Sequence, residues 1–355
     1  MVADVSKYAL INAKLRARIS TILPHEFFFS LLKLRSISEM IPQLRGTAFS
    51  DCADIYDKTG DIKMVEQTLY KREAYLFHEL NQFLPQGLLP LSRAYSTGYE
   101  IENLKNALRL FFDHTIRKRP IDEAIHYLMR DQLVHSIPFD PIINSTSFDD
   151  IISRLQHTPY GEIIQRKRAV VEQTQSLFPL TTDLDRFYYR QLLDTISALS
   201  QRDRLIALRL IGIEIDLQNI NWIIRYRTYY QLPYDSLSDL IIPGGFSFKT
   251  SSLQDIYRSE HVTDPLLDLL KKNYPKIMVL LSQKSHISAS RLTLIEQVLE
   301  QIMHDEVKRL MSGYPFTVGI LLSYYFLKRL EIKRIRTVLN AGYYELSREQ
   351  TASLL

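Results

Sequence analysis

A short phrase that recurs three times constrains most strongly how this 355-residue chain can fold. Each copy has an acidic residue, then an aliphatic residue, and three positions further an aliphatic residue that opens a helical stripe. The acids are Glu100, Asp216 and Glu331, so the copies are spaced by about 115 residues. A near-constant spacing of this size indicates a chain built from copies of one unit.

Two further blocks recur in the same order upstream of that phrase. They occur as Val65–Tyr70, Leu184–Tyr189 and Ile295–Leu299, and as Ser36–Ile41, Ser147–Ile152 and, shortened, Ser252–Tyr257. Chance produces one similar hexamer easily, but not three ordered blocks at matching offsets. We therefore predict three related domains, over residues 1–118, 119–232 and 233–355.

Partial copies stand at both ends of the chain. Ile11–Arg16 matches Ile220–Arg225, and Leu346–Glu349 resembles the expected helix starts at Pro120–Glu123 and Pro233–Ser236. The chain thus begins with the end of a unit and ends with the beginning of one. We predict that its termini pack together in a closed, pseudo-threefold arrangement.

The residue pattern within the repeats is typical of helices. Leu104, Ala107, Leu108 and Phe111 fall at positions i, i+3, i+4 and i+7, which form one apolar face of a helix. Glycine is scarce, with 11 residues, about half of what average usage would give. No run of alternating apolar and polar residues is long enough to indicate a β-strand, so we predict an all-α fold.

The three acids can be interpreted as functional or structural groups. Gly98 and Gly212 stand just before two of them, so we expect these glycines to end the preceding helices. Glu100, Asp216 and Glu331 would then stabilise the starts of the next helices against the macrodipole, by about 0.3–1 kcal/mol each. An active site normally occurs once, so three occurrences favour this structural role.

Other candidate chemistry is weak. Gly244–Thr250 invites a phosphate-loop interpretation, but Phe248 stands where such a loop needs glycine before the lysine. Asp149 and Asp150 could hold magnesium in an all-helical isoprenoid-type enzyme, but Ser153 follows where a further acid is needed. We expect these two acids to serve a helix N-terminus, and we assign no catalytic residue, metal or cofactor.

Charge and cysteine content narrow the class of protein. The formal net charge is only +4, which does not require a nucleic-acid partner. Basic residues cluster at Arg117, Lys118 and Arg119, and we name these as possible contacts with acidic partners or lipid headgroups. One cysteine permits no internal disulfide, which favours a reducing, cytosolic environment.

The order and spacing of several motifs resemble a known family. Gly98–Leu104, Glu214–Ile220 and Ile242–Gly245, with the opening Tyr8–Arg16 and the ending Gly319–Leu339, are similar to the C subunit (also called the d subunit) of V-type and A-type rotary ATPases. The prokaryotic members are the most similar. Each motif alone is weak, but together they extend from about Tyr8 to the end of the chain.

This resemblance implies an all-helical protein of three domains arranged as a funnel or socket. In the family, this subunit lies on the cytoplasmic side of the membrane, between the central stalk and the proteolipid rotor ring. It carries no catalytic residue, because ATP hydrolysis or synthesis and transport of protons or sodium ions occur on other subunits. The resemblance therefore implies a peripheral adaptor with protein partners. The alternative is a helical-repeat protein that binds RNA or another polyanion.

Overall fold

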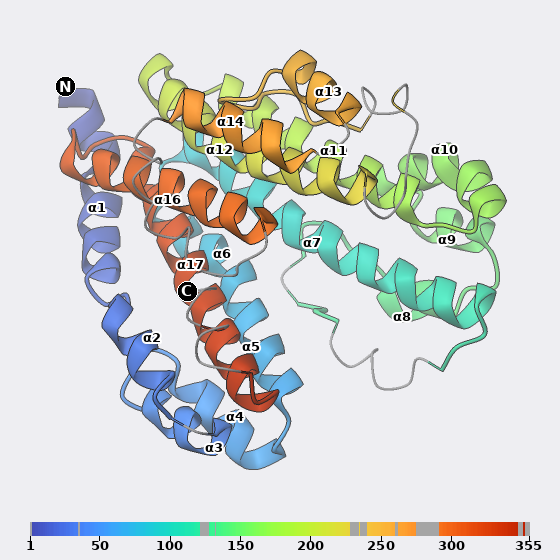
Figure 1. Ribbon diagram of the computed structural model, residues 1–355, viewed down its shortest axis with the longest axis horizontal. Coiled ribbons are helices and arrows are strands. Elements are labelled where there is room, and N and C mark those ends of the chain that lie inside the picture. Colours follow the sequence, from blue (N-terminus) through green and yellow to red (C-terminus); the bar gives the residue numbers. More distant parts are fainter. Residues whose placement is uncertain are drawn as a thin grey trace. The chain divides into compact units, whose positions relative to one another are not determined.

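The described part of the chain is entirely helical in its regular structure. The computed structural model describes residues 2–34, 36–120, 128–131, 133–227, 234, 240–259, 262–274, 291–346 and 351. Every regular element in these ranges is a helix, which confirms the all-α prediction (Figure 1). Within them, no helix combines the length and apolar character that a membrane crossing requires.

The chain divides into two compact units. We call Tyr70–Ala198 the central unit, and Met1–Leu69 together with Leu199–Leu355 the terminal unit. The three-domain division remains a prediction. The helix starts expected at Pro120–Glu123, Pro233–Ser236 and Leu346–Glu349 lie largely outside the described residues.

The central unit is built around two long helices, α7 and α11, that pack on each other. α8 packs on α7, and α10 packs on α9 and α11. Its elements are α6 (Leu76–Leu80), η2 (Asn81–Phe83), η3 (Gln86–Leu88), α7 (Leu89–Phe111), the π-helical turn η4 (Phe112–Ile116), α8 (Phe139–Ile143), α9 (Phe148–Arg154), α10 (Pro159–Thr174) and α11 (Phe178–Ser197).

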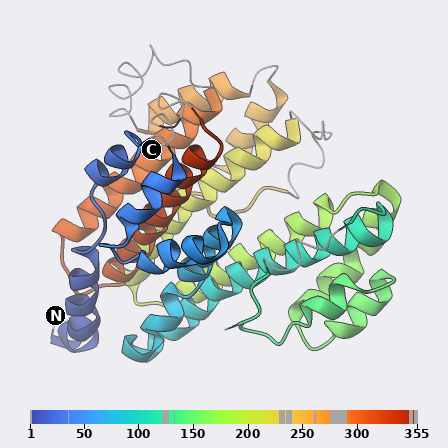
Figure 2. The same ribbon diagram turned by 90° about the horizontal axis from the view of Figure 1, so that it is seen from below.

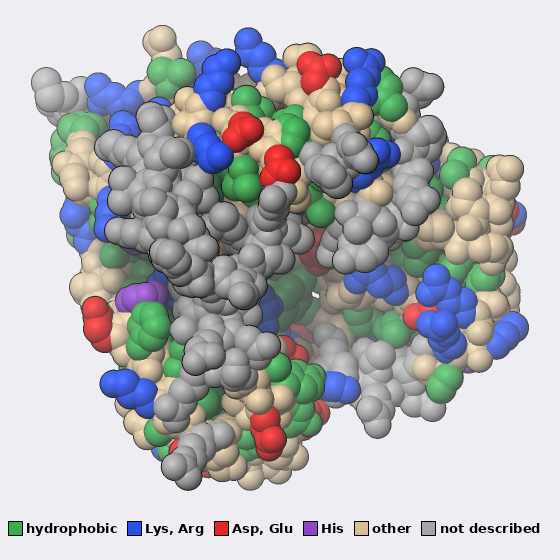
Figure 3. Space-filling view, in the orientation of Figure 1, with side chains coloured by type: hydrophobic (Ala, Val, Ile, Leu, Met, Phe, Trp, Pro, Cys, Tyr) green, Lys and Arg blue, Asp and Glu red, His purple; other side chains and the backbone are tan. Residues whose placement is uncertain are grey.

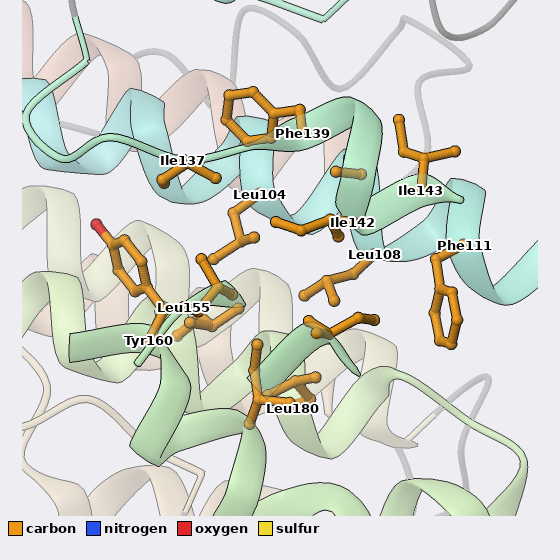
Figure 4. Packing of buried hydrophobic residues seen from close by; sticks show 14 of the residues in the cluster. Leu104, Leu108, Phe111, Ile137, Phe139, Ile142, Ile143, Leu155, Tyr160 and Leu180 are labelled. Carbon is orange, nitrogen blue, oxygen red and sulfur yellow. The ribbon is translucent and has the colours of Figure 1, made fainter. Parts of the chain in front are cut away.

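The core of the central unit is formed by the apolar stripe of α7. Leu104 and Leu108 of this stripe are fully buried and face Ile142 of α8 and Leu155 after α9 (Figure 4). Tyr160 of α10 completes this part of the cluster with its ring. The predicted i, i+3, i+4 pattern therefore lies against the core, where burial of each large apolar side chain contributes about 1.5–3 kcal/mol.

Polar residues at helix starts explain where α9 and α10 begin. The hydroxyl oxygen of Ser147 accepts a hydrogen bond from the backbone N–H of Asp150, and Asp149 and Asp150 lie in the first turn of α9. This confirms that these two acids serve a helix N-terminus. Thr158 caps α10 in the same way, followed by Pro159 at a position where a missing N–H costs nothing.

The terminal unit joins the beginning of the chain to its end. α17 packs on α1, α2, α3, α12 and α16, so helices far apart in sequence share one core; Figures 1 and 2 show the N-terminal helices beside α17. The elements are α1 (Val2–Ile19), α2 (His25–Leu31), α3 (Ile37–Met40), η1 (Ile41–Leu44), α4 (Ser50–Thr59), α5 (Ile62–Ala74, which extends into the central unit), α12 (Gln201–Arg225), α13 (Thr250–Arg258), α14 (Thr263–Asn273), α16 (Arg291–Ser312) and α17 (Gly319–Tyr343).

Two glycines predicted to end helices lie inside them instead. Gly98 is within α7 and Gly212 is within α12. A Cβ at Gly98 would lie 2.7 Å from Cε2 of Tyr188 on α11, and one at Gly212 would lie 2.9 Å from the backbone nitrogen of Phe246. The prediction was wrong because these glycines allow a neighbouring segment to approach the helix closely.

Candidate functional site

The three motif acids lie in the interiors of long helices. Glu100 is in α7, Asp216 in α12 and Glu331 in α17, and their exposed fractions are 0%, 1% and 2%. The helix-start prediction for these acids is therefore wrong, because each helix begins well before its acid. A buried carboxylate is costly unless donors of the protein satisfy it, so the partners of these acids define the site.

Glu100 holds a segment of the central unit against the middle of α7. Its Oε2 accepts a hydrogen bond from the backbone N–H of His135 at 2.7 Å. Its Oε1 accepts one from the hydroxyl of Tyr160 at 2.5 Å and lies 2.7 Å from Nδ1 of His135. Burial, reinforced by the nearby Glu100 charge, raises the pKa of Tyr160, so this hydroxyl stays a donor.

Asp216 holds a glycine-containing turn of the terminal unit against α12. Its Oδ2 accepts from the backbone N–H of Ser247 at 2.6 Å, and its Oδ1 from that of Phe248 at 3.3 Å. A Cβ at Gly245 would collide with Oδ1, so glycine is required there. The amides that a phosphate loop would offer to a phosphate thus bind a carboxylate of the same chain.

The electrostatics of Asp216 reflect its burial. Burial raises the pKa of the Asp216 carboxyl group to about 7, against the backbone hydrogen bonds from Ser247 and Phe248, which favour the ionised form. The carboxyl group therefore titrates near neutral pH in the folded chain.

Glu331 binds the beginning of the chain. Its Oε1 accepts a hydrogen bond from the backbone N–H of Leu23 at 2.8 Å, in the link between α1 and α2. Its Oε2 lies 2.5 Å from the ammonium nitrogen of Lys328, one turn earlier on α17. The third acid thus fastens the N-terminal segment to the middle of α17.

An asparagine one turn after the acid supplies a second fixing point in two of the copies. Asn219 donates to the carbonyl of Ile242 and accepts from its N–H, both at 2.8 Å. Asn103 makes the same pair of bonds with the backbone of Met129. We call Glu100 with Asn103, and Asp216 with Asn219, the carboxylate–amide clamps.

The third copy lacks the amide. Arg334 stands where the asparagine would be, and its guanidinium lies 5.8 Å from the centre of the Phe28 ring. Burial lowers the pKa of Arg334. In the α17 copy, the backbone of the bound segment is therefore held by the hydrogen bond to Glu331.

A fourth buried acid was missed by the sequence reasoning. Asp203, in the first turn of α12, accepts from the hydroxyl of Tyr8 at 2.7 Å and from the backbone N–H of Val318 at 2.8 Å. It thereby joins α1, α12 and the start of α17. The sequence signal was Ser200, whose hydroxyl caps the N–H of Asp203 three residues later.

A buried ion pair in the central unit was also missed. The ammonium nitrogen of Lys105 on α7 lies 2.8 Å from the carboxylate of Asp185 on α11. Burial raises the pKa of Asp185 to about 6, although the charge of Lys105 acts in the opposite direction. This pair links the two long helices of the unit.

The three motif acids are engaged within the chain itself. Both oxygens of Glu100, Asp216 and Glu331 are bound to donors of the chain, and all three side chains are buried. Cys52 is buried in the apolar core. Across the described ranges, His, Cys, Asp and Glu side chains form no group of three or more that could hold a metal.

The predicted basic contacts lie on the surface after η4. Arg117, Lys118 and Arg119 are all exposed, and the Arg117 guanidinium bonds to Asp113 at 2.9 Å. A role for these three residues in partner or headgroup binding remains a prediction. On the face drawn in Figure 3, basic and acidic side chains are interspersed with apolar ones.

Two further basic clusters occur in the sequence, at Arg166–Arg168 and Lys328–Arg336, and several of their residues pair with acids. Lys167 and Arg168 pair with acids of the central unit, and Lys328, Arg329 and Lys333 pair with acids of the terminal unit. Such pairing leaves little unopposed charge for binding a polyanion.

Comparison with known proteins covers nearly the whole chain. The chain is 23% identical to the C subunit of the A-type ATP synthase of Methanothermobacter thermautotrophicus, over 95% of this chain and 84% of that protein. It is 25% identical to that of Methanosphaera stadtmanae (93% and 83%) and 20% identical to that of Methanocaldococcus jannaschii (100% and 88%). Residues 11–354 match the family described as ATP synthase (C/AC39) subunit, and this chain belongs to that family.

Proposed function

We propose that this chain is the non-catalytic adaptor of a V/A-type rotary ATPase. In this role it links the central stalk to the membrane proteolipid ring and transmits torque for proton or sodium transport, coupled to ATP hydrolysis or synthesis. It would lie on the cytoplasmic side of the membrane as a peripheral subunit, with its three repeats arranged as a funnel. Family membership and the relatives from A-type ATP synthases support this proposal.

The observation that carries the mechanical role is the fastening of long helices at their middles. α7, α12 and α17 each hold a remote segment through a buried carboxylate. A part that transmits torque must not bend or unwind under load, and satisfied buried hydrogen bonds together with dense apolar packing resist local opening.

The test is ATP-driven ion pumping by ATPase complexes assembled with and without this chain. We expect complexes lacking it to keep ATP hydrolysis in their soluble sector but to lose pumping into vesicles, and added purified chain to restore pumping. Restoration should accompany co-purification of the chain with stalk and ring subunits. Normal pumping without the chain would contradict the proposal.

The polyanion alternative is tested separately. If the chain binds RNA, a gel-shift with single-stranded RNA should show binding at physiological salt that weakens steeply as salt rises. Lys167, Arg168, Arg329 and Lys333 are paired with acids of the chain, which argues against binding to RNA.

A further inference from the structure

The start of α2 lies along the middle of α17. Leu23, just before α2, donates its backbone N–H to Glu331 of α17 at 2.8 Å. Phe28, in the second half of the same short segment, has its ring centre 5.8 Å from the guanidinium of Arg334, one turn after Glu331. The N-terminal segment is therefore in contact with two successive turns of α17.

α16 packs on the same stretch of α17. Lys333, which precedes Arg334, pairs with Glu300 of α16. His304 and Lys308 follow Glu300 by four and eight residues, so they lie on the same side of α16, one and two turns further along. Three helices, α2, α16 and α17, therefore meet around Arg334.

Two histidines, one from α2 and one from α16, face this arginine. His25 begins α2, one turn before Phe28, and its ring packs edge-on against that of Phe29 at 4.6 Å. The charge of Arg334 acts on both His25 and His304. The buried Nε of Arg334 has no hydrogen-bond partner within the described part of the chain. We call His25, His304 and Arg334 the histidine–arginine cluster.

The net charge around this cluster depends on its histidines. The acids near it are Glu26, Glu300, Asp305 and Glu331, and the bases besides Arg334 are Lys308, Lys328 and Lys333. While both histidines are neutral, acids and bases therefore balance. Protonation of both histidines adds two positive charges beside a guanidinium that is always charged, and like charges at a partly buried site are only weakly screened.

Both histidines resist protonation in the folded chain. Burial lowers the pKa of His304, and the charges of Lys308 and Arg334 lower it further. Partial desolvation and the charge of Arg334 lower the pKa of His25. In both cases an adjacent acid acts in the opposite direction without cancelling the shift. Histidine titrates near 6.5 in the unfolded chain, so a fall in pH through that value favours states in which the cluster is open.

We propose that the histidine–arginine cluster is a pH-sensitive latch that releases α2 from α16 and α17 on acidification. The repulsion acts one turn from the hydrogen bond between Leu23 and Glu331, so it also loosens the link between α1 and α2. α1 is held separately, because Tyr8 donates to Asp203 of α12. The latch goes beyond the proposed function. Its regulatory consequence rests on that function, because an adaptor with a loosened N-terminal segment would transmit torque less well.

Hydrogen exchange of the full chain at pH 7.5 and pH 5.5, measured by mass spectrometry, tests the latch. After correction for the intrinsic effect of pH on exchange, the protection of peptides that cover Leu23 and α2 should fall about fivefold or more at pH 5.5. Peptides from α12 are the internal reference and should change less. Unchanged protection of α2, or an equal fall in α12, would overturn the proposal.

Variants assign the effect to the histidines. The double variant His25→Gln, His304→Gln should reduce the fall in protection to less than about twofold, because an amide does not titrate. His304→Lys introduces a permanent charge and should lower the protection of α2 already at pH 7.5. His157→Gln is the matched control, because His157 is an exposed histidine of the central unit. Fluorescence of Trp222, the only tryptophan, checks that each variant is folded. A wild-type response to pH in the double variant would overturn the latch.

Ion pumping by reassembled ATPase complexes separates the latch from the proposed function. At pH 6 on the side of the soluble sector, complexes with the double variant should keep at least about twofold more pumping per ATP hydrolysed than complexes with the wild-type chain. Equal losses in both would overturn the regulatory role. Failure of the wild-type chain to restore pumping at pH 7.5 would overturn the proposed function, whereas the exchange experiment would still decide the latch.

Discussion

The clamps of α7 and α12 differ from the contact of α17 in where the bound segment lies along the chain. Glu100 and Asp216 bind backbone N–H groups 35 and 31 residues away, whereas Glu331 binds one 308 residues away. All three acids are equally buried in helix interiors. A carboxylate in the middle of a helix thus needs a backbone N–H donor, but this donor can be remote in sequence. In the α17 copy, the hydrogen bond between Glu331 and Leu23 connects the N-terminal segment of the chain to its last long helix.

The three copies also differ in the number and kind of donors that bind the acid. Glu100 receives two side chains in addition to a backbone N–H, and Asp216 receives backbone N–H groups from a tight turn. Glu331 accepts from one backbone N–H and from Lys328, and its copy has Arg334 in place of the asparagine. These differences predict a graded response to substitution.

Removing the acid of α7 should have the largest effect. Glu100→Ala leaves the Tyr160 hydroxyl and the backbone N–H of His135 buried without their acceptor, at a cost of about 3–5 kcal/mol in the free energy of unfolding of the central unit. Urea titration by circular dichroism, with hydrogen exchange of α7, measures this. The control Glu162→Ala alters an exposed acid of α10 and should cost less than about 1 kcal/mol. Equal losses would contradict the clamp.

The titration of Asp216 should make the stability of the folded chain depend on pH. An aspartate titrates near 3.8 in the unfolded chain and, at this position, near 7 in the folded one. Between these values the folded chain keeps a proton that the unfolded chain releases, so stability falls as the pH rises, by at most about 4 kcal/mol.

Asp216→Asn should remove that part of the pH dependence, because an amide does not titrate. Urea unfolding followed by the fluorescence of Trp222 at pH 4.5 and pH 7.5 compares the two chains within the terminal unit. The cost of the substitution should shrink as the pH rises. Parallel pH profiles for the wild type and the variant would refute this assignment.

Crowding the turn that Asp216 binds should have an intermediate effect. Gly245→Ala places a Cβ against Oδ1 of Asp216, and we expect a loss of about 1–3 kcal/mol. In an Asp216→Ala background the same change should cost much less, because the clash is gone. Gly46→Ala is the control, since a Cβ there meets no atom within 4 Å. Additive losses in the double variant would argue against the clamp as the cause.

The amide positions should give the smallest effects. Asn219→Ala removes two hydrogen bonds to the backbone of Ile242, at a cost of about 1–2 kcal/mol. Arg334→Ala at the corresponding position of α17 should cost less than about 1 kcal/mol, because burial already disfavours its charge. Thermal unfolding of both variants tests this order. A larger loss for Arg334→Ala would show that the third copy has a second fixing point after all.

Part of the fold was predictable because it depends on periodicity. The stripe of Leu104 and Leu108 predicted a helix with its apolar face in the core, and it lies there. Asp149 and Asp150 predicted the start of α9 from local chemistry alone. The recurring acids were found in the sequence, but their role was not, since Gly98 and Gly212 suggested helix ends where the helices continue.

The sequence by itself determined the all-helical fold, the recurring motif around the three acids and the family, because these follow from patterns of side chains along the chain. Only the tertiary structure decided what Glu100, Asp216 and Glu331 bind. Their partners are mainly backbone N–H groups, which every residue except proline carries and no sequence pattern marks. Which of these donors meets a buried carboxylate is decided only when remote segments pack against the middle of a helix.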